Sequence, residues 1–387
     1  MAGSRICDVP RVPVAFGKRA VPKLITQLHD EELKIRQGAL CSLCDLLHDP
    51  ERVYEALHHG CLERLKVLLK DDDVLVRTKT TEVLYQLVTR SLGREAVLQN
   101  DVLRPLSELL DEPDDVCRKN VHRVLKMMSE FPAAVVCMLS LGLMPRLVMK
   151  VPVEREDIRE LVLSTLSFCV RLDSLPALAS DVVIILKEQL HQTSTHIRRA
   201  ASSTMMAISV PAEGKVRMCE EQVVPMLVKL LSDDDLEVRA NAAGALMYTT
   251  VITQGKYQAL EAGALPPLLC LVNSEDVAAC AYALRALTCL AQAPTGRAQL
   301  IHHLPQLEAR LCHPASIIQS AAATAMQSSN TGINGEQTGG IIVLVHITGG
   351  KHETERREKI KEGDIHLDCC GTRSLFISDM KLFIDSV

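Results

Sequence analysis

The stretch that decides the fold is LLSDDDLEVRANAAGALMYTT, residues 230–250, because a close counterpart, LLKDDDVLVRTKTTEVLYQLV, occupies residues 68–88. Both stretches place three aspartates before a Val-Arg pair and follow that pair with a run of apolar and small residues. A segment copied within one chain indicates a repeat architecture, in which one supersecondary unit recurs along the sequence.

An arginine recurs at a nearly constant interval along the chain. The six arginines are Arg36, Arg77, Arg118, Arg159, Arg198 and Arg239, separated in turn by 41, 41, 41, 39 and 41 residues. Cys280 and Gln319 hold the same position in the next two copies. The residues three and seven places after this position are apolar or small, so the repeat continues where the arginine does not. We expect the arginines to tie neighbouring copies together through acidic or carbonyl groups; the alternative is that they are simply solvated.

Each copy contains two apolar segments on either side of the aspartate-rich turn. Residues 223–231 (VVPMLVKLL) and 236–250 have apolar residues at helical spacing. An aspartate in the turn can cap the free N–H groups of the next helix, where negative charge is also favoured. We therefore interpret the aspartates as a helix start and not as a cation site. A third, shorter helix ends on Gly263, and Gly60 and Gly142 fill the same place, where glycine is a good helix stop.

A three-helix unit of about 41 residues cannot bury its apolar face alone, but stacked copies can. The chain is 47% hydrophobic and only 3% aromatic, with no tryptophan, as expected of many thin aliphatic layers. We therefore predict an all-α, right-handed α-solenoid of about seven full repeats plus a partial eighth, followed by a non-repeat C-terminal tail.

Charge and composition exclude several classes of partner. The formal net charge is −5, and no basic stripe is present, which argues against nucleic acid as a partner. The first residues have no apolar core typical of a signal peptide, and no segment approaches the about 18 apolar residues of a membrane span. We expect a soluble, intracellular protein that does not bind membranes. Most of the 14 cysteines fall within predicted helices and are interpreted as reduced core residues.

No residue pattern typical of a catalytic, cofactor or metal site is found. Residues 41–44 (CSLC) have CxxC spacing, but they lie in a predicted helix without a second cysteine pair at zinc-ribbon distance. The histidine pairs at 58–59 and 302–303 lie near unit ends, where polar histidines are common. Residues 349–352 (GGKH) lack the earlier glycine and the Ser or Thr of a phosphate loop. We predict a non-enzymatic protein with no catalytic residues, no metal, no cofactor and no small-molecule substrate.

The units resemble armadillo repeats. The resemblance rests on the LPPLLCLV helix, the DxxVR-like turn, the AAGAL helix and the terminal glycine, and it extends across about residues 20–328. It implies a binding scaffold, while the fold alone leaves the partner open. On this basis the chain divides into an N-terminal extension (1–19), an armadillo solenoid (20–328) and a non-repeat tail (329–387).

The expected partner groove departs from that of importin-type repeats. Those repeats carry an asparagine nine residues after the arginine position and a tryptophan five residues after it, and together these bind an extended basic peptide. The present chain has neither the repeated asparagine nor the repeated tryptophan. Its candidate groove residues are Glu82, Gln86, Arg123, Met127, Phe168 and Tyr248. Their mixed character favours a folded or helical partner over a basic peptide. The alternative is that Met127 and Phe168 belong to the core.

A closer resemblance concerns particular units. Residues 13–24 (PVAFGKRAVPKL), 39–85 and 240–260 resemble the armadillo proteins of ciliary and flagellar radial spokes, and the likeness includes the turn HDPE at 48–51. It implies a structural component of the axoneme, in the cytoskeleton of a cilium or flagellum, that contacts other radial spoke proteins and supports motility, including that of sperm. A general cytosolic armadillo adaptor in signalling or protein turnover shares every repeat feature and remains the alternative.

The repeat period is lost after Met326. Residues 328–340 (SSNTGINGEQTGG) resemble a linker, and a β-like run, IIVLVHI, occupies residues 341–347. We interpret the tail as a variant C-terminus that arises from alternative splicing or from read-through in a gene model; a partner-binding segment is the functional alternative. We expect it to be poorly ordered and to contribute little to the stability of the repeats.

Overall fold

A computed structural model describes residues 19–330, and this part of the chain is helical throughout. Its α-helices and two short 3-10 helices are joined by tight turns, and no strand occurs between residues 19 and 330. The predicted all-α fold class is confirmed.

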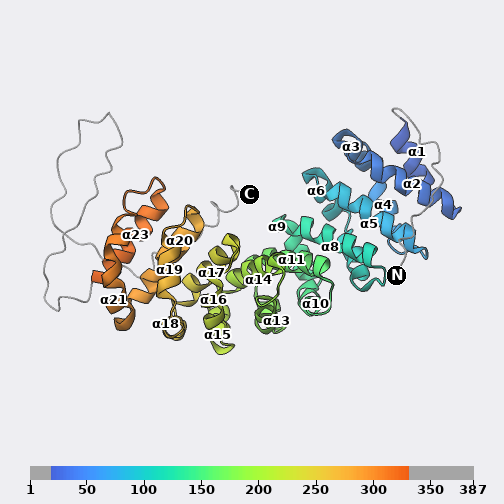
Figure 1. Ribbon diagram of the computed structural model, residues 1–387. Helices are drawn as coiled ribbons and strands as arrows, with labels where there is room; N and C mark the ends of the chain where they lie inside the picture. The colour runs from blue at the N-terminus through green and yellow to red at the C-terminus, as the bar shows by residue number, and fades with distance from the viewer. Residues whose placement is uncertain (1–18, 331–387) are drawn as a thin grey trace, which may run out of the picture. The chain divides into compact units, whose positions relative to one another are not determined.

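Each of the eight units contains one long helix of 14 to 17 residues. The long helices are α2 (Leu33–Leu46), α5 (Val74–Val88), α8 (Asp115–Ser129), α11 (Glu156–Leu172), α14 (Thr195–Ile208), α17 (Leu236–Thr249), α20 (Val277–Ala291) and α23 (Ser316–Asn330). Each packs against the long helix of the next unit, so the long helices lie side by side in chain order (Figure 1). This stacking is the solenoid that the period of the sequence predicts.

A shorter helix precedes each long helix, and a shorter helix follows each of the first seven. The preceding helices are α1 (Ala20–Gln27), α4 (Cys61–Leu68), α7 (Leu103–Ser107) with η1 (Glu108–Asp111), α10 (Leu143–Lys150), α13 (Val182–Gln189), α16 (Val224–Leu230), α19 (Leu265–Val272) and α22 (Leu304–Glu308). The following helices are α3 (Pro50–His58), α6 (Ser91–Gln99), α9 (Pro132–Ser140), α12 (Leu175–Leu178), α15 (Ala212–Glu220), α18 (Thr253–Glu261) and α21 (Pro294–Leu300) with η2 (Ile301–His303). The described residues thus form seven full units and a partial eighth, as predicted.

The aspartate-rich turns start the long helices, as their sequence predicts. The third aspartate of each run, Asp73 or Asp235, accepts a hydrogen bond from the backbone N–H three residues later, at 2.9 and 3.1 Å. Asp114 and Asp276 make the same bond at the start of α8 and α20. A side-chain cap of this kind stabilises a helix by about 0.5–2 kcal/mol relative to alanine.

The predicted helix stops are confirmed by the backbone. Gly60, Gly142 and Gly263 have φ angles of 69°, 66° and 77°, in the left-handed region that glycine adopts without steric cost. Asp101 and Gln222, at the equivalent place in two other units, adopt φ angles of 49° and 54°. The turn is therefore a property of the repeat, and glycine is its least strained occupant.

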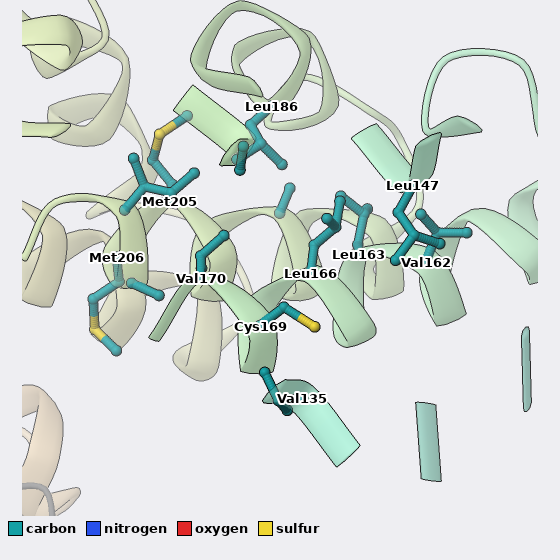
Figure 2. Close-up of a cluster of buried hydrophobic side chains, with 14 of the residues drawn as sticks. Val135, Leu147, Val162, Leu163, Leu166, Cys169, Val170, Leu186, Met205 and Met206 are labelled. Atoms are coloured by element: carbon teal, nitrogen blue, oxygen red, sulfur yellow. The ribbon is translucent and has the colours of Figure 1, made fainter. Parts of the chain in front are cut away.

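The core consists of one aliphatic layer per unit. The residue seven places after the repeated arginine position is at most 1% exposed in every full unit; these residues are Leu43, Leu84, Leu125, Leu166, Met205, Leu246 and Leu287. Figure 2 shows the layer around α11, where Leu163, Leu166 and Val170 lie among side chains from the neighbouring helices. Full burial of one such side chain contributes about 1.5–3 kcal/mol.

A second repeated feature brings the third helix of a unit close to the end of its long helix. Gly93, Gly214, Gly255 and Gly296 each lie 16 residues after the arginine position. A Cβ atom at any of these four glycines would lie 1.8–2.3 Å from a carbonyl oxygen at the end of the long helix. Because real Cβ atoms cannot approach that closely, these glycines fix how the third helix packs in four of the units.

The helices run from Ala20 to Asn330, two residues beyond the predicted end of the repeats at 328. Ser329 is fully buried and belongs to α23, so it is part of the last unit and not of the tail. The predictions for the N-terminal extension up to residue 18 and for the tail from residue 331 concern residues outside those described.

Candidate functional site

The repeated arginines form a ladder along the turns between the first and second helices of the units. Four of the six pair with an acid in the turn of the next unit: Arg36–Asp71 at 3.1 Å, Arg77–Glu112 at 2.8 Å, Arg118–Glu154 at 3.0 Å and Arg198–Asp233 at 2.7 Å. Each of these four also donates from Nη1 to two main-chain carbonyls in the turn that precedes its own helix. One guanidinium therefore joins two consecutive turns.

The ladder changes in two places. Arg159 donates to the amide oxygen of Gln189 at 3.3 Å in place of a carboxylate. Arg239 donates to the carbonyl oxygens of Asp233 and Asp234 at 2.7 and 3.0 Å, but the position equivalent to Asp233 in the next unit is Ser274. The step between the sixth and seventh units therefore has the carbonyl bonds without a carboxylate at the usual place.

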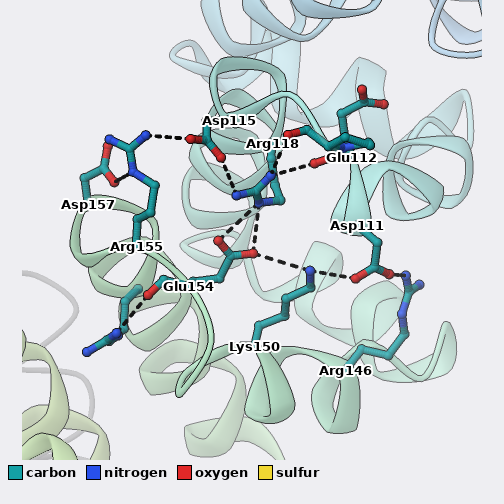
Figure 3. Close-up of polar contacts among 11 residues, drawn as sticks. Asp111, Glu112, Asp115, Arg118, Arg146, Lys150, Glu154, Arg155 and Asp157 are labelled. Atoms are coloured by element: carbon teal, nitrogen blue, oxygen red, sulfur yellow. Dashed lines mark hydrogen bonds and ion pairs between the residues drawn. The ribbon is translucent and has the colours of Figure 1, made fainter. Parts of the chain in front are cut away.

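Figure 3 shows the densest part of the ladder, between the third and fourth units. Arg118 pairs with both Asp115, at 2.6 Å, and the buried Glu154. Lys150 bridges Glu154 at 3.3 Å and Asp111 at 2.6 Å. The hydrogen bond from Lys150 holds the pKa of Asp111 below its usual range. Since every carboxylate in this network meets a cation, the network stabilises the stack and offers no free acid or base.

His122 lies in α8 and is completely buried. Neither ring nitrogen has a hydrogen-bond partner among the described residues. Burial, together with the nearby cations of Lys150 and Arg118, lowers the pKa of His122 to about 3. The imidazole is therefore neutral near pH 7, and it costs stability because two polar atoms are desolvated without compensation.

The cysteines and acids do not assemble into a reactive or metal-binding centre within residues 19–330. Cys61 and Cys169 are buried, and burial raises the pKa of each thiol to about 12, so neither is a nucleophile at neutral pH. Burial also raises the pKa of Cys44, in the CxxC segment of α2. No group of three or more potential ligand residues occurs in the described part of the chain.

Within residues 19–330, no helix is by itself long and apolar enough to cross a bilayer. The helices α9 and α10 have sufficient length and apolar composition only when taken as a pair, and the pair bends by 90° at its break. Both helices of this pair bury residues in the core of the stack.

Four of the predicted groove residues lie on two adjacent long helices, α5 and α8. Glu82 pairs with Lys79 at 2.8 Å. The Cζ atom of Arg123 lies 3.6 Å from the centre of the Tyr85 ring, a close cation–π contact. Gln86 is half-buried, and Met127 is half-buried and packs against the core. The side chains here are thus partly committed to one another and to the core.

The other two predicted groove residues lie further along the stack. Phe168 is half-buried on α11, with the Cζ atom of Arg171 5.5 Å from its ring centre. Tyr248, on α17, packs partly against the core, and Nζ of Lys215 lies 6.0 Å from its ring centre. Because α14 lies between α11 and α17, the six residues follow the stack and do not form one compact site.

The structure adds residues that the sequence analysis did not single out. We use the term long-helix face for the side of the long helices of the fourth to seventh units that carries Phe168, Arg171, Tyr248, Tyr282 and Arg285. Met206 and Tyr282 lie on either side of Gly244, with Sδ and Cδ2 at 2.3 and 3.3 Å from where a Cβ atom would be. Desolvation lowers the pKa of Arg171, whereas electrostatic interaction with Tyr282 and Tyr248 raises it. Both phenol groups therefore lie near this guanidinium.

Comparison with known proteins identifies one repeat directly. A family model described as Armadillo/beta-catenin-like repeat matches residues 211–248. This range covers α15, α16 and α17 and contains the DDDLEVR turn.

Solved structures show the same fold over more of the chain. An engineered protein matches with a TM-score of 0.75 and 21% identity, covering 80% of this chain and 78% of the other. A designed armadillo repeat protein matches with a TM-score of 0.56 and 19% identity, covering 59% of this chain and 99% of the other. A second designed armadillo repeat protein, in complex with the peptide (KR)4, matches with the same values. The chain therefore has the fold of an armadillo-repeat solenoid, and its residues 211–248 form a repeat that the family model itself matches.

Proposed function

We propose that the protein is a non-enzymatic scaffold of the axonemal radial spoke that binds other spoke proteins. The observation that carries the binding role is the long-helix face, where partly exposed aromatic and arginine side chains of α11, α17 and α20 lie along the stacked long helices. These residue types are enriched in the cores of protein–protein interfaces and among the residues that dominate binding energy. An armadillo solenoid is typically a binding scaffold, which agrees with this role.

The assignment to the radial spoke is supported by sequence resemblance. Residues 39–85 and 240–260 resemble the radial spoke head protein fourteen homologue, also called the rhabdoid tumour deletion region protein. The likeness includes the HDPE turn at 48–51, in which Asp49 caps α3 by accepting a hydrogen bond from the N–H of Glu51 at 2.9 Å. Because a generic armadillo repeat does not require this turn, it favours the particular resemblance over a general adaptor.

The arginine ladder suits a scaffold that has to keep its shape under load. Its ion pairs and carbonyl bonds join consecutive turns in four places, and the aliphatic layers continue from unit to unit. In repeat proteins each unit contacts only its neighbours, so the strength of each junction determines the stiffness of the stack.

Proximity labelling in ciliated cells or sperm tests the proposal. The full chain is fused to a biotin ligase, and a second ligase fusion that is free in the cytosol gives the background. We expect radial spoke subunits to be enriched over that background. Enrichment of proteasome or receptor components without spoke subunits would contradict the spoke assignment and favour a general armadillo adaptor.

A further inference from the structure

The turn that precedes α20 lacks the acids that other turns of the ladder supply. The seventh unit has an amide and a hydroxyl, Asn273 and Ser274, where the third unit has two carboxylates, Asp111 and Glu112. In the third unit these two acids pair with cations of the units after and before it, at 2.6 and 2.8 Å. The turn of the seventh unit has therefore lost both negative charges.

The arginine of the preceding unit remains in the ladder position. Nη1 of Arg239 donates to the carbonyl oxygens of Asp233 and Asp234, in the way that Nη1 of Arg198 donates within its own turn. Arg198 also binds the carboxylate of Asp233, from Nε at 2.7 Å and from Nη2 at 3.1 Å. Within residues 19–330, Nε and Nη2 of Arg239 have no such partner. Two donors of a correctly held guanidinium are thus left without an acid.

Ser274 places its hydroxyl oxygen where the acids of the ladder place a carboxylate oxygen. Ser274 Oγ accepts the N–H of Asp276 at 3.2 Å, and Asp233 Oδ1 accepts the N–H of Asp235 at 3.0 Å. The same bond occurs in the second unit at 3.0 Å. Ser274 is half-buried between two exposed neighbours, and no group in the described part of the chain accepts its hydroxyl proton. The oxygen is therefore positioned for the ladder and remains available for reaction.

A second arginine lies beside the same turn, from the unit that follows. Nη2 of Arg310 donates to Oδ1 of Asn273 at 2.9 Å, and its Nε is buried without a hydrogen-bond partner among the described residues. The acids of the turn do not neutralise these cations. Asp276 caps α20 with a hydrogen bond of 2.6 Å, and neither it nor Glu275 pairs with Arg239 or Arg310 in residues 19–330. An added anion would find unpaired donors on both sides.

We propose that Ser274 is a phosphorylation site, and that a phosphate on its Oγ binds Arg239 and completes the missing step of the ladder, with Arg310 as a second cation beside it. A protein kinase supplies the phosphoryl group from a nucleoside triphosphate. Oγ forms a bond to the γ-phosphorus, the bond from that phosphorus to the β-phosphate oxygen breaks, a nucleoside diphosphate leaves, and the hydroxyl proton passes to a base of the kinase. Phosphoserine has a charge of about −1.5 to −2 and three acceptor oxygens, which suit the paired donors of a guanidinium.

The other incomplete step of the ladder does not offer this chemistry. The residue at the acid position opposite Arg159 is Gln192, which has no hydroxyl, and Arg159 already bonds to Gln189. Phosphorylation of Ser274 would therefore act on one junction, between the sixth and seventh units. It concerns the regulation of the scaffold and does not depend on the identity of its partners.

The geometry is tested with the full chain carrying phosphoserine at position 274, introduced during translation. Phosphorus NMR follows the titration of the phosphate, whose second pKa is expected to lie at least about 0.5 below the usual value of about 6, because the arginines favour the dianion. The midpoint of thermal unfolding is expected to rise by about 1–3 °C over the unmodified chain. Phosphoserine at position 232 is the matched control, since Ser232 is exposed in the turn of the sixth unit, is followed by acids, and lies beside Arg198, which Asp233 already pairs. Its pKa is expected to stay at or above about 6.

Variants of the chain with phosphoserine at 274 identify the partner of the phosphate. Arg239→Gln is expected to return the second pKa to about 6 and to remove the gain in thermal stability, and Arg310→Gln to cause a smaller change of the same sign. Arg104→Gln is the control, because it removes the same charge from an exposed side chain of the third unit. Circular dichroism checks that each variant is folded.

The modification itself is tested by mass spectrometry of the peptide that contains Ser274, from the full chain expressed in ciliated cells and lysed with phosphatase inhibitors. A phosphate on Ser274 is expected, and it is expected to disappear after phosphatase treatment. The proposal is overturned if this peptide is recovered only without phosphate. It is also overturned if the phosphates at 274 and 232 titrate alike, or if Arg239→Gln changes the titration at 274 no more than Arg104→Gln does.

Discussion

Arg77 binds Glu112 through two parallel hydrogen bonds, from Nε to Oε2 at 3.0 Å and from Nη2 to Oε1 at 2.8 Å. These bonds join the long helix of the second unit to the turn of the third, 35 residues later in the chain. The hydrogen bond raises the pKa of Arg77, and only 7% of Glu112 is exposed. A buried carboxylate of this kind depends on its partner, because removing one member leaves an uncompensated charge.

Arg77→Ala is therefore expected to lower the free energy of unfolding by about 2 kcal/mol or more. Urea denaturation followed by circular dichroism measures the change. Arg104→Ala is the control, since Arg104 and its partner Asp101 are 65% and 61% exposed and such a pair contributes about 0–1 kcal/mol. If the two variants lose equal stability, the ladder is a set of ordinary surface ion pairs.

Ser274→Asp is expected to stabilise the seventh unit by about 0.5–1 kcal/mol. The new carboxylate would take the place that Asp233 has opposite Arg198, with Arg239 as its partner, and it can still accept the N–H of Asp276 as Ser274 Oγ does at 3.2 Å. Ser274→Ala separates the two effects because it removes the bond to Asp276 and adds no charge. If Ser274→Asp unfolds at a temperature no higher than that of Ser274→Ala, this account of the ladder is contradicted.

His122 makes stability depend on pH. The folded-state pKa of about 3 is below the value of about 6.5 for an unfolded histidine, so only the unfolded chain takes up this proton between those values. The part of the free energy of unfolding that depends on His122 has its full value above about pH 6.5 and decreases as pH falls toward 3. One proton corresponds to about 1.4 kcal/mol per pH unit over this range.

His122→Leu removes the group that takes up this proton, so the pH dependence of the free energy of unfolding is expected to fall by about one proton. Stability at pH 7 is expected to be unchanged or higher, because the variant removes two unsatisfied polar atoms from the core. The measurement is urea denaturation at several values between pH 7 and 5. His196→Leu is the control, since the His196 side chain is 67% exposed. An unchanged pH slope in His122→Leu would show that other groups cause the acid sensitivity.

Gly214→Ala is expected to destabilise the protein by about 2 kcal/mol or more. Its Cβ atom would lie 1.8 Å from the carbonyl oxygen of Ile208, so α15 would have to move away from the end of α14. At Gly142 a Cβ atom meets open space, and alanine there costs only the left-handed backbone, about 1–2 kcal/mol. Thermal unfolding of the two variants compares the effects, and a smaller loss at Gly214 would mean that the third helix adapts easily.

The sequence predicts well what repeats in every unit. Local residue chemistry that recurs in each copy predicts the period of about 41 residues, the helix caps at Asp73 and Asp235, and the glycines that end helices. The residues seven places after the repeated arginine position could be placed in the core because they are apolar in every full unit.

Contacts between units were harder to predict. Gly214 and its equivalents look like ordinary helical glycines until the third helix is placed against the long helix. Met127 has the character of a binding residue, yet it packs partly against the core, because rotation of α8 decides which side faces outward. Arg171 and Tyr282 lie on different units and become neighbours only through the stacking of α11, α14, α17 and α20.

The central claim is that the long-helix face is the binding surface of this scaffold. Photo-cross-linking in ciliated cells tests it most directly, with benzoylphenylalanine placed at Phe168 on this face or at Tyr257 on α18, both of which replace an aromatic side chain. The account predicts cross-links to a radial spoke protein from position 168 and none from position 257. Cross-links from position 257 alone, or from neither position in cells where proximity labelling enriches spoke subunits, would contradict it.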